Sequence, residues 1–380
     1  MQKKIIALAI AAMASGAALA QSNVQVYGVV DAGVAAINAD GKQTMFKVES
    51  GMLRTSRLGF KGTEDLGNGL KALFALEYRL NVDANQGIGG TFPTDAAGVQ
   101  GSTSGPARQQ LLGLSGGFGT VAIGRMNTTA FDWAVKYNVL GASIFDVTGN
   151  NAMAAGSRVN ALADIRLSNT LAYKSPTWAG FHFDVNYARP IEQAATGDGK
   201  VNVWQLGTYY DRGPLSLGIV YDRVKGSGSA SLALSSLAFA RGAGFPAPAT
   251  TIAYDDLDAK SLNIGGAYNF GFAKLKATYQ NDKFNTQASN TVWGVGTEIP
   301  VSANGMVHVV YSRSSVDTLA NADSSGFSVA YTHNLSKRTI AYAGFSQQSN
   351  DSAGTSGIWA ASPTAGGDVN VLAAGLTHMF

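Results

Sequence analysis

The chain has 380 residues, with 28 lysine and arginine residues, 25 aspartate and glutamate residues and no cysteine. Charged residues make up 14% of the chain and glycine fills 46 positions, whereas soluble domains contain about 25% charged residues and about 7% glycine. This composition excludes a disordered polyelectrolyte, a disulfide scaffold and a metal centre held by thiolates. The formal net charge of +3 is too small for a chain of this length to indicate nucleic-acid binding.

Residues 1–20 have the three parts of a secretory signal peptide. Two lysines open the segment, residues 5–13 form a short apolar core, and residues 18–20 (Ala-Leu-Ala) offer a cleavage site between small side chains. The apolar core is shorter than the roughly 20 residues that a membrane-spanning helix needs. We therefore predict export and a mature chain of residues 21–380, in which removal of two of the 28 basic residues leaves 26 against 25 acidic ones.

The mature chain contains no apolar run long enough to span a membrane as a helix, and its apolar residues alternate with polar or small ones. In residues 70–79, the even positions are apolar or small, whereas Lys71, Glu77 and Arg79 stand on the opposite face. Side chains alternate between the two faces of a strand, so this pattern predicts amphipathic strands and not helices. The alternation returns in residues 181–187, 215–221 and 274–279.

Short clusters of Gly, Pro and Asn separate the predicted strands and indicate tight turns. In chain order, the seven predicted turns are residues 65–69, 116–119, 176–180, 212–214, 269–271, 300–305 and 335–338. Between consecutive turns lie two strands joined by a longer and irregular stretch. The long stretches include residues 82–107, 127–165, 226–258 and 350–367. Short turns at one end and long loops at the other are typical of a bacterial outer-membrane barrel.

Seven hairpins account for 14 strands, and one more strand at each end, near residues 23–36 and 368–380, gives 16. An even number lets the last strand pair with the first and leaves no open edge. Closure is needed because an unpaired backbone group in lipid costs several kcal/mol. We therefore predict an all-β protein, a 16-stranded antiparallel transmembrane barrel in a single domain, residues 21–380.

A large soluble β-sandwich is the alternative, because alternation alone does not say whether the apolar faces meet each other or meet lipid. Two features favour the membrane barrel: the chain ends on Phe380, and aromatic residues gather near the ends of the predicted strands, as an interfacial girdle requires. The aromatic residues concerned are Trp178, Phe181, Tyr209, Tyr210, Tyr268, Phe270, Phe272 and Tyr331.

Residues 56–72 (SRLGFKGTEDLGNGLKA) are similar to the second strand, first turn and third strand of the Gram-negative general porins, most closely of the beta-proteobacterial type. The resemblance extends from about residue 24 to residue 380. Further similar segments are Val26-Tyr27-Gly28, Asp31-Ala32-Gly33, Gly117 to Val121, Gly124-Arg125 and Gly375 to Phe380. The resemblance implies trimers, a third long loop folded into the pore, and a terminal aromatic residue, here Phe380, that the outer-membrane insertion machinery recognises.

Strand parity predicts, independently of the family, which charged side chains enter the lumen. In residues 57–61, Leu58 and Phe60 must face lipid, so Arg57 and Lys61 face inward. The same rule turns Lys71, Glu77, Arg79 and Arg166 inward. In residues 108–114 the rule is less decisive, because Leu111 and Leu112 are adjacent.

The resemblance implies a constriction in which arginines on the barrel wall face acids on the inward loop. By their local motifs, the basic positions are Arg57, Arg108, Arg125 and Arg166. We take the constriction loop as about residues 127–165, with Asp132 and Asp146 as its candidate acids. In the constriction loop of enteric porins, an acidic residue is expected near the position that Asn138 occupies here. This chain departs from that pattern.

Inward basic residues outnumber acidic ones on predicted strands two to six, which predicts passive diffusion of ions and small hydrophilic solutes with a modest anion preference. A substrate-selective channel is the alternative function. In another interpretation, the arginines pair with Glu77 or with loop acids and only hold the loop in place. The expected partners are two further copies of the chain in a homotrimer, outer-membrane lipid, lipopolysaccharide and the insertion machinery.

Other chemistry has weaker support in the sequence, and we predict a channel, not an enzyme, without metal or other cofactor. Residues 113–117 fit the G-x-S-x-G pattern of a nucleophile elbow, but that motif requires a strand-to-helix turn, and a strand pattern follows here. The four histidines lack metal-binding spacing. A barrel hydrolase and an adhesive surface protein remain as minor alternatives. The acidic run Asp255-Asp256-Leu257-Asp258 is either a solvated loop or a site for divalent cations that bridge lipopolysaccharide.

Overall fold

The structure is a computed structural model that describes residues 23–84, 88, 107–154, 166–191, 199–228, 231–233, 251–253, 257–284, 289–317, 319–359 and 361–380. The predicted signal peptide and part of the predicted constriction loop, residues 155–165, lie outside the described residues.

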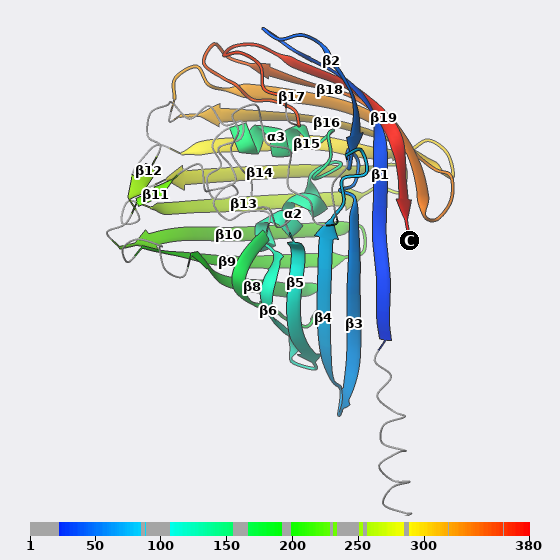
Figure 1. Ribbon diagram of the computed structural model, residues 1–380, viewed down its shortest axis with the longest axis vertical. Helices are drawn as coiled ribbons and strands as arrows, with labels where there is room; N and C mark the ends of the chain where they lie inside the picture. The colour runs from blue at the N-terminus through cyan, green and yellow to red at the C-terminus, as the bar shows by residue number, and fades with distance from the viewer. Residues whose placement is uncertain are drawn as a thin grey trace, which may run out of the picture.

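Antiparallel strands dominate the described residues, and two short helices interrupt them (Figure 1). Among these residues, no helix combines the length and the apolar composition that crossing a membrane requires. The elements are β1 Asn23–Ala39, β2 Met45–Ser50, β3 Arg57–Gly67, β4 Leu70–Arg79, β5 Ala107–Gly116, β6 Gly119–Asn127, α2 Thr129–Tyr137, α3 Val147–Ala154, β7 Arg166–Lys174, β8 Phe181–Ile191, β9 Lys200–Arg212, β10 Leu215–Ser227, β11 Ser231–Ala233, β12 Thr251–Ala253, β13 Asp258–Asn269, β14 Lys274–Phe284, β15 Asn290–Pro300, β16 Gly305–Val316, β17 Ser324–Asn334, β18 Thr339–Asn350 and β19 Val369–Met379.

The sheet closes on itself because the first strand pairs with the last. On one side of β1, Val29 lies opposite Met379 and Ala39 lies opposite Val369, so β1 and β19 form the seam of the barrel (Figure 1). On its other side, β1 pairs with β3 and then with β2. These two strands are halves of one strand interrupted at residues 51–56, so the sheet is the predicted closed barrel of 16 strands.

All seven predicted turns are confirmed, because each lies between two strands that pair in antiparallel register. The hairpins are β3–β4, β5–β6, β7–β8, β9–β10, β13–β14, β15–β16 and β17–β18. The short pair β11–β12 belongs to the long stretch between β10 and β13.

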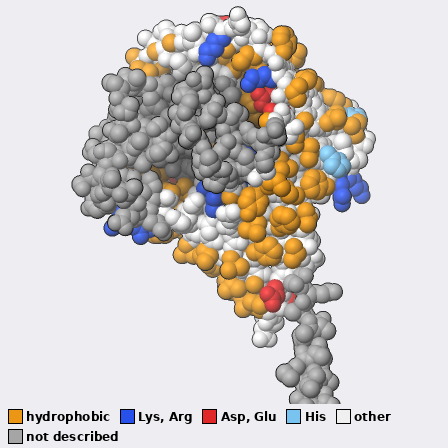
Figure 2. All heavy atoms as spheres, viewed as in Figure 1, with side chains coloured by type: hydrophobic (Ala, Val, Ile, Leu, Met, Phe, Trp, Pro, Cys, Tyr) orange, Lys and Arg blue, Asp and Glu red, His pale blue; other side chains and the backbone are white. Residues whose placement is uncertain are grey.

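The outside of the barrel is apolar, as the alternation predicts. On β13, Leu262 and Ile264 are exposed, whereas Ser261 and Asn263, which alternate with them, are buried on the inward face. Figure 2 shows hydrophobic side chains spread over the outer surface around β1, β3 and β4. In a soluble sandwich this surface would be covered by a second sheet. Here it faces outward on every side of a closed wall, which fits a lipid environment.

The aromatic girdle is present near the short turns, with one exception among the residues predicted for it. Phe272 and Trp178 are exposed there, and the rings of Phe181 and Tyr210 lie 4.5 Å apart on the outer face. Tyr209 is instead 5% exposed and stacks on His182, with ring centroids 4.8 Å apart. Tyr209 precedes Tyr210 by one position on β9, so the pleat turns it inward.

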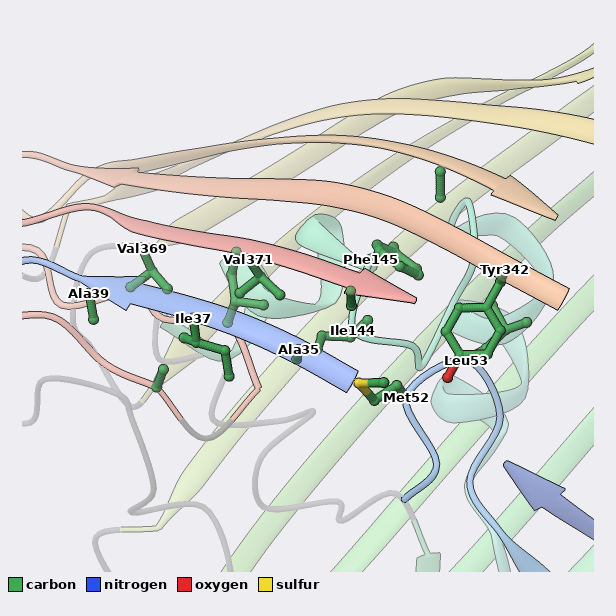
Figure 3. Packing of buried hydrophobic residues seen from close by; sticks show 14 residues of the cluster. Ala35, Ile37, Ala39, Met52, Leu53, Ile144, Phe145, Tyr342, Val369 and Val371 are labelled. Atoms are coloured by element: carbon green, nitrogen blue, oxygen red, sulfur yellow. The ribbon is translucent and has the colours of Figure 1, made fainter. Parts of the chain in front are cut away.

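The lumen is not polar throughout, because chain segments fold into it and cover part of the wall. At the seam, Ile37 of β1 and Val371 of β19 are fully buried on the inward face. They belong to a cluster with Met52 from the strand interruption, Phe145 from the constriction loop and Ile358 from the last long loop (Figure 3). We call this group the seam cluster. The simple expectation of a wet inner face fails here because these apolar segments exclude water.

Candidate pore constriction

The basic wall gathers around one buried carboxylate, that of Glu77 on β4. The Nε atom of Arg108 lies 2.6 Å from its Oε1 atom, and the Nε atom of Arg57 lies 3.4 Å from its Oε2 atom. The Tyr27 hydroxyl donates a hydrogen bond of 3.1 Å to Oε2. Glu77 is 4% exposed, so two guanidinium groups and a phenol take the place of its hydration shell. We call Arg57, Glu77 and Arg108 the arginine–glutamate cluster.

Arg108 reaches this cluster because of a bulge that parity alone does not reveal. Glu77 pairs with Gln109, but the next residue, Tyr78, pairs with Ala107, so Arg108 is the extra residue on β5. A bulge of this kind redirects a side chain and interrupts the alternation. It turns Arg108 toward the Glu77 carboxylate and resolves the ambiguity that the sequence left for this strand.

Arg79 and Lys61 extend the basic wall on either side of the cluster. Arg79 donates a 3.0 Å hydrogen bond from Nε to the side-chain oxygen of Asn81, and it is close enough for its charge to interact with that of Arg108. Lys61 places its Nζ atom 5.1 Å from the centroid of the Tyr27 ring, a cation–π contact. Both therefore add positive charge to the same part of the lumen.

Lys71 lies away from this group, although it is on an inward position as predicted. It pairs with Asp65 beside the first short turn. It lies six positions before Glu77 on β4, which at about 3.3 Å per residue is roughly 20 Å along the strand. Lys71 therefore belongs to the short-turn end of the lumen and is not part of the constriction.

Arg125 and Arg166 connect the wall to the constriction loop. Arg125 donates from Nε to the Ala107 carbonyl oxygen at 2.7 Å and from Nη1 to the Ser168 hydroxyl oxygen at 3.1 Å. The guanidinium of Arg166 lies 5.1 Å from the centroid of Phe131, a ring on α2. These contacts fix the root of the loop against β5 and β7. They also place Arg166 between the wall and the loop.

Asp132 is a loop acid that interacts electrostatically with two basic residues of the wall, Lys174 and Arg166. It lies in the first turn of α2, where a negative charge is favoured by the helix dipole, and Asn127 donates a 2.8 Å hydrogen bond to its Oδ1 atom. Burial raises the pKa of Asp132, an effect opposed by the Asn127 hydrogen bond and by the positive charges of Lys174 and Arg166. Asp132 can therefore form the negative side of the pore.

Asp146 has a different environment, because its carboxylate is used within the loop. It is buried and accepts hydrogen bonds from the Asn138 side chain and from the backbone N–H groups of Ala142 and Gly149. Burial raises the pKa of Asp146, and the two backbone hydrogen bonds oppose that rise. The Gly149 contact is an N-cap of α3. Asp146 therefore holds the loop in shape and does not face the arginine–glutamate cluster.

Inward-facing glycines on the opposite wall make the space in which the loop lies, and the sequence analysis missed them. Figure 1 shows α2 and α3 inside the barrel, where α2 contacts β8, β9, β10, β13 and β14 and α3 contacts β15 to β18. An added Cβ at Gly294 would lie 2.5 Å from the Thr148 hydroxyl oxygen, and one at Gly344 would lie 2.7 Å from the Phe145 ring. We call the glycines in such contact with the loop the glycine seat. Its members are Gly207, Gly218, Gly265, Gly294, Gly296, Gly326 and Gly344.

Hydrogen bonds also fasten the loop to the wall. Lys276 on β14 donates to the Asn138 carbonyl oxygen at 3.1 Å and forms an ion pair of 2.8 Å with Glu298. The Ser324 hydroxyl donates to the Asn151 side-chain oxygen at 2.9 Å. The loop is thus held at the C-terminal end of α2 and along α3.

A buried acid that the sequence analysis did not single out, Asp31, supports the strand interruption at residues 51–56. Its carboxylate accepts hydrogen bonds from the backbone N–H of Arg54 at 3.1 Å, from the Tyr342 hydroxyl at 3.0 Å and from the Thr377 hydroxyl. The interruption in turn contacts the constriction loop, because the Ile144 N–H donates to the Met52 carbonyl oxygen at 2.8 Å. Asp31 therefore positions a segment that touches the loop.

The last residue completes the barrel seam. The Phe380 carbonyl oxygen accepts from the Gly28 N–H at 3.0 Å, and the Phe380 N–H donates to the Gly28 carbonyl oxygen at 3.1 Å. An added Cβ at Gly28 would collide with the Phe380 ring. The glycine therefore admits the terminal aromatic side chain onto β1.

Sequence comparison finds relatives along nearly the whole chain. The family described as Gram-negative porin matches residues 7–353. Outer membrane porin protein 32 of Delftia acidovorans is 32% identical, with 97% of this chain and 95% of that protein covered. An outer membrane porin protein of Bordetella pertussis is 27% identical, with 90% of this chain and 93% of that protein covered.

Structural comparison agrees with the sequence match. The anion-selective porin from Comamonas acidovorans superimposes with a TM-score of 0.73 at 28% identity, covering 95% of this chain and all of the other. The trimer form of OmpT from Vibrio cholerae shares the fold, with a TM-score of 0.63 at 16% identity and 94% and 99% of the two chains covered. Porins are channels of the outer membrane, which agrees with the prediction of a channel and not an enzyme. The chain belongs to the Gram-negative porin family.

Proposed function

We propose that this porin conducts ions and small hydrophilic solutes by passive diffusion and prefers anions to a modest degree. The observation that carries the preference is the charge imbalance at the arginine–glutamate cluster. Two guanidinium groups share the single carboxylate of Glu77. Arg79 brings a third positive charge close to Arg108, and the charges of Asp83 and Glu49 also act on Arg79. The similarity to a porin described as anion-selective supports the same direction.

The expected preference is modest because the lumen is wet. Two unit charges about 7 Å apart interact by roughly 0.6 kcal/mol in water and by about 2.4 kcal/mol at an effective dielectric constant of 20. Surplus arginines can thus favour anions several-fold without excluding cations. The Debye length is about 8 Å at physiological salt, so the preference declines as the salt concentration rises.

Reversal potentials across a planar bilayer under a salt gradient test this proposal. We expect the parent protein to favour chloride over potassium, and the triple variant Arg57→Ala, Arg108→Ala, Arg166→Ala to lose most of that preference. A matched triple variant in the short turns, Arg212→Ala, Lys337→Ala, Arg338→Ala, removes the same charge far from the constriction and keeps the preference. Cation preference in the parent, or an unchanged Arg57/Arg108/Arg166 variant, refutes the proposal.

We also propose that three copies assemble through the arc of the wall that runs from β19 through β1 to β6. The exposed large side chains on β1, β4, β5, β6 and β19 are aliphatic, whereas those on β8 to β17 include most of the exposed aromatic residues. Aromatic residues mark surfaces at the lipid interface. The arc carries fewer of them, with Phe46 of β2 and Phe60 of β3 among its exposed residues. A mainly aliphatic arc suits contact with another copy of the chain, and the trimer of a structural neighbour supports this assembly. Phe380 is proposed to serve as the assembly signal.

A further inference from the structure

The strand interruption at residues 51–56 projects into the lumen. β2 ends opposite Ala32 of β1 and β3 begins opposite Val29, so six residues stand where β1 has two, and four of them must leave the sheet. They leave it on the inward side, because Met52 and Leu53 are buried in the seam cluster with side chains of the inner wall (Figure 3). The interruption is therefore a part of the wall that strand parity does not describe.

This bend turns the side chain of Arg54 into the lumen. The Arg54 backbone N–H donates to the carboxylate of Asp31 at 3.1 Å, and its Nη1 atom lies 3.7 Å from the sulfur atom of Met379. Met379 faces inward, because the pleat places it on the same side of β19 as the buried Thr377. The Arg54 residue is exposed, so its guanidinium group meets the water of the pore and not lipid.

Arg54 lies beside the arginine–glutamate cluster, on the side of the barrel seam. Val29 of β1 pairs with Met379 on one side and with Arg57 on the other. Two strand spacings of about 4.8 Å therefore separate Met379 from Arg57, which is roughly 10 Å. The charge of Arg54 acts on that of Arg57. The two guanidinium groups thus belong to the same level of the pore.

Arg54 differs from the wall arginines because no acid pairs with its guanidinium group. Arg57 and Arg108 share the carboxylate of Glu77, whereas Arg54 has no ion pair among the residues that the structure describes. Asp31 accepts the Arg54 backbone N–H and not the guanidinium group, and its carboxylate is fully buried. The charge that this segment exposes to the lumen is therefore positive.

We propose that Arg54 is a further determinant of the anion preference, and that a permeating inorganic anion or carboxylate contacts its guanidinium group beside the arginine–glutamate cluster. Guanidinium groups form strong charge-assisted hydrogen bonds with anionic oxygens, and Arg54 offers such donors without a competing acid. The inference rests on the proposed function, because it names a residue that acts on the same ion path. It assigns this role to a residue outside the regular strands.

Reversal potentials under a salt gradient test the contribution of Arg54. We expect Arg54→Gln to lower the ratio of chloride to potassium permeability about threefold or more, since a unit charge roughly 7 Å from an ion changes its occupancy by about that factor even at the dielectric constant of water. Arg54→Lys keeps the charge and most of the ratio. The matched control is Lys71→Gln, which removes one inward cation at the short-turn end of the lumen and keeps the parent ratio.

A thiol at the same position separates the effect of charge from that of structure. The chain has no cysteine, so Arg54→Cys carries a single thiol, which forms a mixed disulfide with positively or negatively charged methanethiosulfonate reagents. We expect the positive reagent to raise the chloride-to-potassium ratio of this variant and the negative reagent to lower it. The same treatment of Lys71→Cys leaves the ratio unchanged. All Arg54 variants keep the hydrogen bond to Asp31, because it comes from the backbone.

An unchanged ratio in Arg54→Gln, or equal shifts with the two reagents, overturns the inference. Equal loss in Arg54→Gln and Lys71→Gln also overturns it, because it means that the overall charge of the lumen and not residue 54 sets the ratio. Failure of the proposed function is a different result, in which the parent protein itself prefers cations. In that case, Arg54→Gln still moves the ratio further toward potassium if Arg54 lines the ion path.

Discussion

At the scale of single residues, a few buried polar groups set the geometry of the wall. Glu77 orders two arginines by pairing with both, and Asp31 orders the interruption between β2 and β3 by accepting hydrogen bonds from three different segments. A buried carboxylate of this kind is tolerated because hydrogen bonds replace its hydration. Both residues act on the pore, one directly and the other through the loop contact at Met52.

Replacement of Asp31 by asparagine tests its structural role. Asp31→Asn replaces one accepting oxygen by an NH₂ group, so at least one buried donor loses its acceptor. The loss lowers the free energy of unfolding by about 1–3 kcal/mol. We expect a lower free energy of unfolding in urea and noisier single-channel currents. Asp65→Asn serves as the control, since this acid lies at the exposed end of β3 and accepts a hydrogen bond from the Gly67 N–H. Equal stability of both variants contradicts the assigned role.

At the scale of elements, the constriction loop is placed by the wall it rests on. Few interactions within α2 and α3 themselves stabilise these short helices. One is the N-cap of α2, where the Thr128 hydroxyl accepts a hydrogen bond from the Phe131 N–H at 3.1 Å. The glycine seat lets these helices approach the strands closely, and Lys276 and Ser324 fasten them there. The width of the pore therefore depends on residues that do not line it.

The variant Gly294→Ala tests the glycine seat. The new methyl group would meet Thr148 at 2.5 Å, so either α3 moves toward the pore axis or the wall is strained, at a cost of about 1–3 kcal/mol. We expect lower single-channel conductance and reduced thermal stability. Gly266→Ala is the control, because the nearest neighbour of its new methyl group would be a Leu217 methyl 3.3 Å away, outside the glycine seat. Parent-like conductance in Gly294→Ala would show that the seat does not set the aperture.

At the scale of the whole molecule, the outer surface has a mainly aliphatic arc, from β19 through β1 to β6, and a remainder that carries most of the exposed aromatic residues. Val34 lies near the middle of the arc, opposite Ala374 of β19 and Val48 of β2. Ile264 of β13 is also exposed, in the part of the surface that carries most of the aromatic residues. The proposed trimer uses the first surface for protein contact and leaves the second to lipid.

An arginine placed on each surface distinguishes them. Val34→Arg is expected to convert trimers to monomers in analytical ultracentrifugation, because the charge would be buried between subunits. Ile264→Arg costs about 2–4 kcal/mol of stability if it lies near the bilayer midplane, but it leaves the trimer intact. If Ile264→Arg dissociates the assembly and Val34→Arg does not, the arc has been assigned to the wrong surface.

The sequence predicts the parts of this structure that follow from local alternation. Parity places Arg57, Lys61 and Glu77 inward because lipid requires their neighbours to face outward, and the turns follow from glycine, proline and asparagine. The bulge at Arg108 and the contacts of Asp146 depend on partners distant in sequence, so parity does not reveal them. Glycines at inward positions of β15 to β18 were a visible signal of close approach, but their partner, the loop, was known only by resemblance.

The two helices in the constriction loop and the inward position of Tyr209 were not predicted either. Helix α2 has only nine residues, and isolated helices of this length are marginal in water. It forms because Trp133 and Tyr137 are buried against the wall. Tertiary contacts thus decide the structure of this segment, and a local pattern carries little information about them.

The seam cluster imposes an order of events on biogenesis. It joins Ile37 near the start of the chain, Val371 near its end and Phe145 of the constriction loop in one apolar contact (Figure 3). Neither β1 alone nor β19 alone provides the apolar surface that Phe145 contacts. The eyelet of the pore therefore acquires its final shape only when the chain ends have met, and a half-assembled barrel cannot sieve solutes as the finished one does.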